Sequence, residues 1–170
     1  MSQPNIILTG FMGTGKTTLG QLLAEKIGYQ FVDTDALIEK RIGRTIAELF
    51  EEQGETAFRK LESNLVEELA QKERLVIATG GGLVLDPNNV AALGKTGKII
   101  CLAASPEEIL SRISKRQGTR PLLQEKNPQA KIIELLQQRG SVYRQFPQLS
   151  TSKLSREELI ERLVKLTQAE

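Results

Sequence analysis

The chain has 170 residues and a formal net charge of only +2, from 23 lysines and arginines against 21 aspartates and glutamates. So small an excess of positive charge gives no support for a nucleic-acid-binding surface. An apolar fraction of 39% and a charged fraction of 26% are ordinary for a globular protein, and the length favours one domain over residues 1–170.

Neither a signal peptide nor a membrane-spanning segment is expected, because the first residues carry no basic region and no apolar run approaches 18 residues. Cys101 is the single cysteine, so it cannot form a disulfide within the chain, and its apolar neighbours predict a small core residue. These features favour a cytoplasmic protein. Without a long exposed apolar stripe, a monomer is the default. The chain has no histidine, so acid–base chemistry would fall to carboxylates, lysine or tyrosine.

Strand-like and helix-like segments alternate along the chain. The predicted strands are residues 5–9, 30–33, 75–79, 98–103 and, briefly, 149–152. The predicted helices are residues 18–27, 35–42, one begun by Thr45, one ending near Lys72, 87–93, 106–116, 128–146 and one after Ser155. Such alternation is typical of parallel strands joined by right-handed helical crossovers. It predicts an α/β fold, a three-layer α/β/α sandwich with a central parallel sheet of about five strands.

Two of the predicted helices begin with a recognisable capping pattern. The pairs Thr45/Glu48 and Ser155/Glu158 have the spacing of a capping box, in which side chain and backbone satisfy each other's hydrogen bonds. Residues 117–127 are instead polar, with a glycine and a proline among them, and predict a mobile loop.

The segment Gly-Phe-Met-Gly-Thr-Gly-Lys-Thr at residues 10–17 fits the pattern G-x-x-x-x-G-K-[ST] between a predicted strand and a predicted helix. In such a P-loop the backbone N–H groups cradle phosphate oxygens, and the helix N-terminus adds its positive dipole end. Lys16 would reach the outer phosphates, and the Thr17 hydroxyl can ligate Mg²⁺. A glycine-rich turn that binds nothing is the alternative, and both flanks argue against it. The expected nucleotide-binding residues of this loop are Gly13, Thr14, Gly15, Lys16, Thr17 and Thr18.

Asp33 and Asp35 follow the second predicted strand. Residues two apart in an extended chain point the same way, so both carboxylates can face the cleft beyond the strand ends. One would suit Mg²⁺, directly or through water, and the other could accept a proton from a substrate hydroxyl. The alternative is that Asp35 only caps the helix that follows it.

Three glycines, Gly80, Gly81 and Gly82, follow the third predicted strand, where many nucleotide hydrolases carry an acidic residue. Three glycines in a row cost chain entropy on folding. Close approach of a ligand to the backbone, with N–H groups as donors, would explain them. A loose connection to the next segment is the alternative.

Together these motifs resemble the shikimate kinase family over nearly the whole chain. The matching segments are 10–20, Phe-Val-Asp-Thr-Asp at 31–35, Phe-Arg-Lys-Leu-Glu at 58–62, Thr-Gly-Gly-Gly at 79–82, Arg-Pro-Leu-Leu at 120–123, and Arg139 with Tyr143. The resemblance implies a P-loop kinase fold like that of the nucleoside monophosphate kinases. It also implies transfer of the γ-phosphoryl group of ATP to the 3-hydroxyl of shikimate, in chorismate and aromatic amino acid biosynthesis.

The resemblance further implies roles for single residues. Lys16, Asp35 and Arg120 would be catalytic, with Arg120 swinging in from a lid over residues 117–127. Thr17 and Asp33 would hold one Mg²⁺ ion per subunit, with ATP as co-substrate. Arg59 and Arg139 would grip the substrate carboxylate, and the N–H groups of Gly80, Gly81 and Gly82, chiefly Gly81, would contact shikimate. The helical region of about residues 34–62 would bind the substrate.

Each arginine also has a plainer interpretation. Arg59 lies four residues after Glu55 and could form a surface helix pair, Arg139 could be a solvated charge near a helix end, and Arg120 could be an ordinary loop residue. Residues 149–156 lack a match for the arginine that family members often carry near adenine. Arg116 is a candidate to stack on the base instead.

Two other functions remain open at this stage. A kinase of the same architecture could use another small acceptor such as gluconate or a nucleoside monophosphate, although an aromatic content of 4% argues against a base pocket. A nucleotide switch without a small substrate is a different class. The chain has no guanine-reading N-K-x-D segment, and Lys16, Asp35 and Arg120 are all present.

Overall fold

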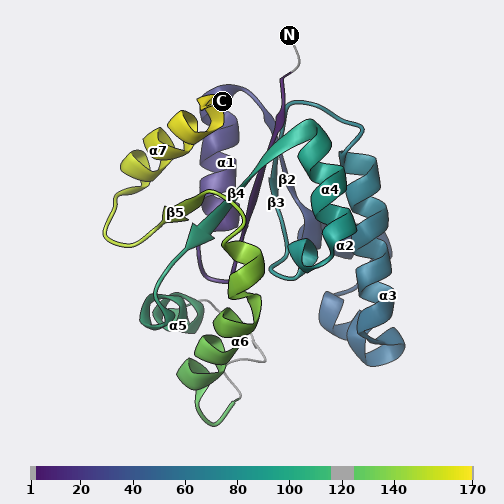
Figure 1. The fold of residues 1–170 in the computed structure, drawn as a ribbon. Coiled ribbons are helices and arrows are strands. Elements are labelled where there is room, and N and C mark those ends of the chain that lie inside the picture. Colours follow the sequence, from purple (N-terminus) through teal and green to yellow (C-terminus); the bar gives the residue numbers. More distant parts are fainter. Residues whose placement is uncertain (1–2, 116–124, 170) are drawn as a thin grey trace.

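A computed structural model describes residues 3–115 and 125–169 (Figure 1). Its centre is a five-stranded sheet in the order β2-β3-β1-β4-β5, in which all neighbours are parallel. The strands are β1 (Asn5–Gly10), β2 (Gln30–Asp33), β3 (Leu75–Ala78), β4 (Gly97–Ala103) and β5 (Gln148–Ser150). All five predicted strands are confirmed, with ends that differ by at most two residues. The middle strand β1 is buried along its whole length.

Helices cover both faces of the sheet, which confirms the three-layer sandwich (Figure 1). Along β1, Ile7 enters one core while Ile6 and Leu8 enter the other, because successive strand residues point to opposite faces. The core around Ile6 and Leu8 is completed by α1 (Lys16–Ile27) and α7 (Arg156–Gln168). The helices that contribute to the other core are α2 (Thr34–Ile42), α3 (Ile46–Leu69), α4 (Pro87–Thr96), α5 (Pro106–Lys115) and α6 (Pro128–Tyr143). None of the helices in the described residues is long and apolar enough to cross a membrane.

Both predicted capping boxes are present. Thr45 caps α3 with Glu48, and Ser155 caps α7 with Glu158. The two helices predicted between Thr45 and Lys72 lie end to end as α3 and meet in a kink at Gly54, whose φ of 80° and ψ of 174° suit glycine alone.

Three local predictions need correction. Helix α1 begins at Lys16 rather than Thr18, because Gly15 in a left-handed conformation is its N-cap. A short 3₁₀ helix, η1 (Leu83–Leu85), follows the three glycines and was not predicted. The N-cap of α2 is Asp33, not Asp35, since the Asp33 side chain accepts a hydrogen bond from Ala36 N–H.

Candidate active site

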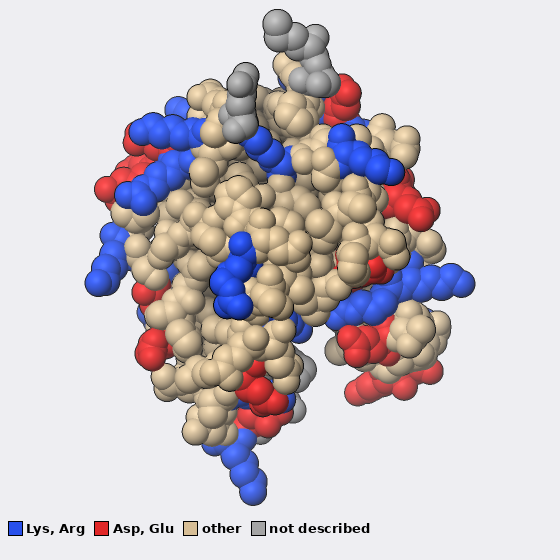
Figure 2. All heavy atoms as spheres, viewed as in Figure 1, with Lys and Arg blue, Asp and Glu red and all other residues tan. Residues whose placement is uncertain are grey.

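A cavity of about 530 Å³ opens beyond the carboxyl ends of β1, β2 and β3. Figure 2 shows the molecule hollowed between the lobe of α5 and α6 and the lobe of the first turns of α3. The structure brings together most of the predicted site residues in its walls: Gly13, Gly15, Lys16, Thr17, Asp33, Asp35, Arg59, Gly80, Gly81, Gly82 and Arg139. Arg116, Arg120 and most of the predicted lid lie outside the described residues.

The P-loop takes its shape from its glycines and from Thr14. Gly13 and Gly15 have φ values of 77° and 96°, in the left-handed region that glycine adopts without strain. Gly10 leaves no room for a side chain, because a methyl group there would lie 2.3 Å from the carbonyl oxygen of Leu102 on β4. Thr14 is buried, and its hydroxyl donates to the Phe11 carbonyl at 2.7 Å, which closes the turn.

Lys16 lies folded over this loop. Its Nζ donates to the carbonyl oxygens of Gly10 at 2.6 Å and Phe11 at 3.0 Å. Burial lowers the pKa of Lys16 to about 8, against the opposing effect of the Asp35 carboxylate. The ammonium group is therefore a half-buried cation at the cavity whose hydrogen-bond partners are neutral carbonyls, an arrangement that favours an incoming anion such as phosphate.

The Thr17 hydroxyl and the Asp33 carboxylate meet at the edge of the P-loop, where Thr17 Oγ1 donates to Asp33 Oδ2 at 2.8 Å. The two oxygens of Asp33 are thus divided between capping α2 and facing Thr17. Over residues 3–115 and 125–169 no group of three or more His, Cys, Asp or Glu residues could hold a metal ion. A hydroxyl and one carboxylate fit Mg²⁺, which usually keeps several waters and takes its other ligands from substrate phosphates.

Asp35 lies in the first turn of α2 and also faces the cavity. The expectation that both carboxylates face the cleft is therefore correct, but the reason is not an extended chain, because α2 already begins at Thr34. Asp35 Oδ1 is buried and has no hydrogen-bond partner among the described residues. Burial raises the pKa of Asp35 to about 6, the Asp33 carboxylate adds to the rise, and Lys16 opposes it. The carboxyl group thus lines the cavity with a raised pKa, a state that suits proton uptake from a substrate hydroxyl.

The three glycines lie against charged side chains, so a larger residue there would displace those side chains from the positions they occupy. A methyl group on Gly80 would lie 2.7 Å from Asp35 Oδ1, and one on Gly82 would lie 2.5 Å from Arg59 Nη2. The close approach is thus made by the protein's own side chains and does not need a ligand. The N–H of Gly80 donates to Thr34 Oγ1 at 3.1 Å, so it is already used. The N–H groups of Gly81 and Gly82 form no hydrogen bond with another described residue.

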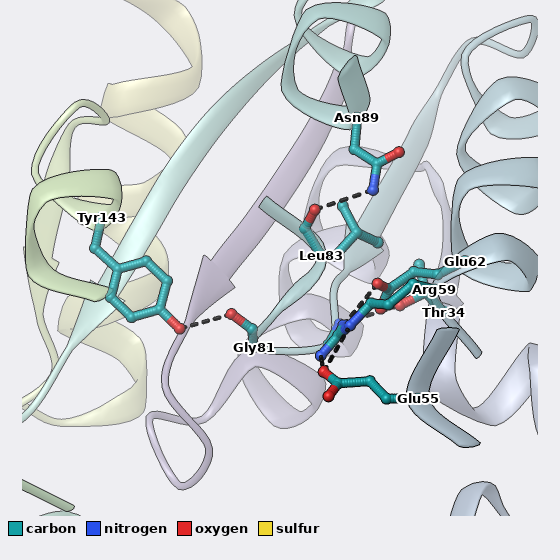
Figure 3. A network of polar contacts seen from close by, with 9 residues as sticks. Thr34, Glu55, Arg59, Glu62, Gly81, Leu83, Asn89 and Tyr143 are labelled. Carbon is teal, nitrogen blue, oxygen red and sulfur yellow. Dashed lines mark hydrogen bonds and ion pairs between the residues drawn. The ribbon is translucent and has the colours of Figure 1, made fainter. Parts of the chain in front are cut away.

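Arg59 forms the predicted pair with Glu55, at 3.2 Å, but it also faces the cavity (Figure 3). Its Nη1 donates to Glu62 Oε1 at 2.8 Å, and the Glu62 side chain is only 1% exposed. Burial raises the pKa of Glu62 to about 6, although Arg59 opposes the rise. The sequence did not lead us to predict that Glu62 is the buried partner of Arg59. Its position three residues after Arg59, a spacing at which helix side chains can pair, was the available indication.

Arg139 enters the same cavity from α6, with its guanidinium carbon 5.6 Å from the centre of the Phe11 ring. A methyl group on Gly81 would lie 3.1 Å from Arg139 Nη1. Two guanidinium groups from distant parts of the chain therefore flank the glycine turn, an arrangement that suits a carboxylate.

Phe50 and Phe58 give the cavity an apolar part, with ring centroids 5.4 Å apart. Sequence reasoning did not assign either to the site.

Arg112 was also missed. It donates to the Gly13 carbonyl at 3.0 Å and to Thr151 Oγ1 at 2.9 Å, so it ties the P-loop to the segment after β5. The sequence indicated only that Arg112 lies four residues after Glu108 and could pair with it on a helix. The structure has this pair, with Arg112 Nη2 3.1 Å from Glu108 Oε2.

Comparisons with known proteins agree on one family. The sequence profile described as shikimate kinase matches residues 12–168. The shikimate kinase of Thermodesulfovibrio yellowstonii is 46% identical over 162 residues, which are 95% of this chain and 93% of that protein. The shikimate kinase of Caldanaerobacter subterraneus is 51% identical over 140 residues, 82% of this chain and 81% of that protein.

Solved structures are similar as well. The shikimate kinase from Acinetobacter baumannii in complex with shikimate is 38% identical, with a TM-score of 0.88 over 96% of this chain and 92% of that one. A gluconokinase from Sinorhizobium meliloti is 19% identical, with a TM-score of 0.59 over 96% of this chain and 93% of that one. The second likeness shows a shared fold and nothing further.

Proposed function

The chain belongs to the shikimate kinase family, and on that basis we propose how its residues transfer the γ-phosphoryl group of ATP to the 3-hydroxyl of shikimate. The reaction yields 3-phosphoshikimate and ADP, so the enzyme is an ATP-dependent phosphotransferase with an alcohol acceptor. One observation carries the proposal: a phosphate-binding loop, an unpartnered carboxyl oxygen of Asp35 and two guanidinium groups share one cavity.

In the proposed mechanism, the backbone N–H groups of residues 13–18 hold the phosphates of ATP at the N-terminus of α1. Lys16 leaves the carbonyl groups of the P-loop and contacts the outer phosphates. Thr17 and Asp33 would hold one Mg²⁺ ion per subunit, which would supply positive charge to offset that of the ATP phosphates.

The acceptor hydroxyl lies at the Asp35 carboxylate. Its oxygen forms a bond to the γ-phosphorus, the bond from that phosphorus to the bridging oxygen breaks, and ADP leaves with the bond's electrons. The hydroxyl proton passes to the Asp35 carboxylate. Positioning and electrostatic stabilisation supply most of the rate enhancement, because phosphoryl transfer needs little covalent help from the protein.

The shikimate carboxylate lies between Arg59 and Arg139 and accepts hydrogen bonds from the free N–H groups of the glycine turn. Charge-assisted hydrogen bonds to two guanidinium groups fix the orientation of the ring, and so bring the 3-hydroxyl to Asp35. We place this clamp within the helical substrate-binding region of about residues 34–62, completed by α6, in one kinase domain over residues 1–170.

An ADP-release assay with shikimate, gluconate and nucleoside monophosphates tests the proposed acceptor. We expect shikimate to have the highest kcat/KM by orders of magnitude. Gluconate is the nearest competitor, since it also carries a carboxylate and hydroxyl groups. A kcat/KM for gluconate or a nucleotide equal to or above that for shikimate would contradict the proposal.

We further propose a monomeric, cytoplasmic enzyme that binds neither nucleic acid nor membranes. A net charge of +2 and the mixture of both signs of charge on the face in Figure 2 argue against binding to nucleic acid or to an anionic membrane. A sedimentation coefficient that rises with protein concentration would contradict the monomer.

A further inference from the structure

The segment that follows β3 is held by side chains from three different helices (Figure 3). Thr34 of α2 accepts the N–H of Gly80 at 3.1 Å. The hydroxyl of Tyr143, the last residue of α6, donates to the Gly81 carbonyl at 2.7 Å. Asn89 of α4 donates from Nδ2 to the Leu83 carbonyl at 3.0 Å. All three side chains are buried, so these contacts are shielded from water.

The hydrogen bond from the Tyr143 hydroxyl to the Gly81 carbonyl also determines the direction of the Gly82 N–H, which belongs to the same peptide group. In a planar trans peptide the carbonyl group and the following N–H point in opposite directions. The peptide that contains the Gly81 carbonyl contains the Gly82 N–H, so fixing the carbonyl toward Tyr143 directs that N–H away from Tyr143. Figure 3 shows Gly81 between Tyr143 on one side and Arg59 on the other. The Gly82 N–H therefore points away from Tyr143 and is free for a ligand.

The neighbouring peptide is fixed by the turn itself. The Gly80 carbonyl accepts the N–H of Leu83 at 3.2 Å, which orients the Gly81 N–H in the same way. The peptide between Gly81 and Gly82 has no such backbone partner at its carbonyl, and its partner is the Tyr143 hydroxyl. With glycine on both sides, this peptide can rotate at little steric cost when it is not held.

We propose that Tyr143 is a positioning residue for substrate binding: its hydroxyl holds the peptide between Gly81 and Gly82 so that the Gly82 N–H faces the substrate carboxylate, beside the Gly81 N–H that the turn itself orients. The inference rests on the proposed binding of shikimate at this turn. Burial raises the pKa of Tyr143, so the hydroxyl keeps its proton and remains a donor.

The plainer interpretation is that Tyr143 only fills the core, to which its ring belongs. Tyr143→Phe distinguishes the two, because it keeps the ring and removes only the hydroxyl. Tyr29→Phe is the matched control: Tyr29 is the one other tyrosine of the chain, and it packs against the core on the α1 and α7 side of the sheet.

The first experiment measures binding by calorimetry, for shikimate and for its carboxamide, in which a neutral amide replaces the carboxylate. We expect Tyr143→Phe to raise the Kd of shikimate about tenfold, which is about 1.4 kcal/mol. The Kd of the carboxamide and the KM of ATP should change less than about twofold, since neither depends on donors aimed at a carboxylate. Tyr29→Phe should match the wild type. An unchanged Kd for shikimate, or an equal loss for both ligands, overturns the proposal.

A second measurement does not depend on the variant folding. In nitrogen-15-labelled wild-type protein, the amide signals of Gly81 and Gly82 should shift when shikimate saturates the site and shift much less with the carboxamide. If both signals stay in place with shikimate, the proposal is wrong. Activity of the wild-type enzyme on shikimate tests the proposed function separately. An active wild type with an unaffected Tyr143→Phe variant would refute only the role of Tyr143.

Discussion

Replacing Arg59 with alanine should weaken both the fold and substrate binding, and a second substitution separates the two effects. Glu62 is buried, and Arg59 Nη1 at 2.8 Å is its cationic partner. Arg59→Ala leaves that carboxylate unpaired in the protein interior. Its second oxygen, Oε2, already has no hydrogen-bond partner among the described residues.

The magnitude follows from the pKa of Glu62. Burial raises this pKa from 4.5 to about 6 even with Arg59 present, and a rise of roughly 1.5 units corresponds to ~2 kcal/mol. The folded state binds this proton more tightly than the unfolded state. Stability therefore falls as pH rises from about 4.5 to about 6, and the full cost is present above that range. Without Arg59 the pKa of Glu62 should rise further and extend this range upward.

Removal of one partner from a buried pair typically costs about 3–5 kcal/mol. The Arg59 side chain is 35% exposed, so water screens the pair and we expect the lower end, about 3 kcal/mol, at pH 8. Near pH 5 the loss should be smaller, because Glu62 is then largely protonated in both proteins and needs no cation.

Urea unfolding at pH 5 and pH 8 measures these free energies for the wild type, Arg59→Ala and Arg59→Ala/Glu62→Gln. At pH 8 the double variant should regain most of the lost stability, since glutamine carries no charge. In both variants shikimate should bind more weakly than in the wild type by on the order of 2–5 kcal/mol, because Arg59 is missing from the proposed carboxylate clamp. Equal destabilisation at both pH values would refute the burial effect. Recovery of shikimate affinity in the double variant would refute the clamp.

Three further predictions concern the chemistry of the site. Lys16→Ala should abolish phosphoryl transfer with a circular dichroism spectrum near wild type, because among the described residues the Lys16 Nζ donates only to P-loop carbonyls. Substantial remaining activity would remove Lys16 from the mechanism. Asp35→Asn should lower kcat by roughly 10²-fold, the lower end for general-base catalysis, and leave the Mg²⁺ requirement unchanged, whereas Asp33→Asn should raise the Mg²⁺ concentration needed for half-maximal rate. Mg²⁺ titrations of both variants check this assignment. The opposite pattern would mean that the two aspartates have exchanged roles. Arg139→Ala should weaken shikimate binding by on the order of 2–5 kcal/mol and leave ATP binding nearly unchanged. Calorimetry with each ligand measures both binding free energies. A loss of shikimate binding free energy below about 1 kcal/mol would indicate that Arg139 is an ordinary surface charge.

The elements and the phosphate loop were predictable because their signals are local. The capping boxes at Thr45 and Ser155 lie within four residues of sequence, and both are present. The P-loop pattern likewise specifies its own backbone, since Gly13 and Gly15 occupy the left-handed conformations that the turn requires. The alternation of strands and helices was enough to predict the parallel sheet.

Local signals did not decide between neighbouring residues of similar chemistry. Asp33 and Asp35 are both good helix caps, and which of them caps α2 depends on where β2 ends against β3. The burial of Glu62 could not be predicted either, because a glutamate three residues after an arginine is usually a solvated pair. Arg116 and Arg120 lie outside the described residues, and their roles remain predictions.

The sequence by itself determined which motifs the chain contains, the order of its strands and helices, and the residue types that can bind phosphate and carboxylate. Only the tertiary structure decided how those residues meet. Tyr143 and Gly81 are 62 positions apart, yet they share a hydrogen bond because α6 packs against η1, the short helix that directly follows the glycine turn. A side chain at position 80 or 82 would displace Asp35 or Arg59, which occupy the space beside these glycines. Contacts of this range depend on the packing of whole helices against the sheet, which no local pattern of residues encodes.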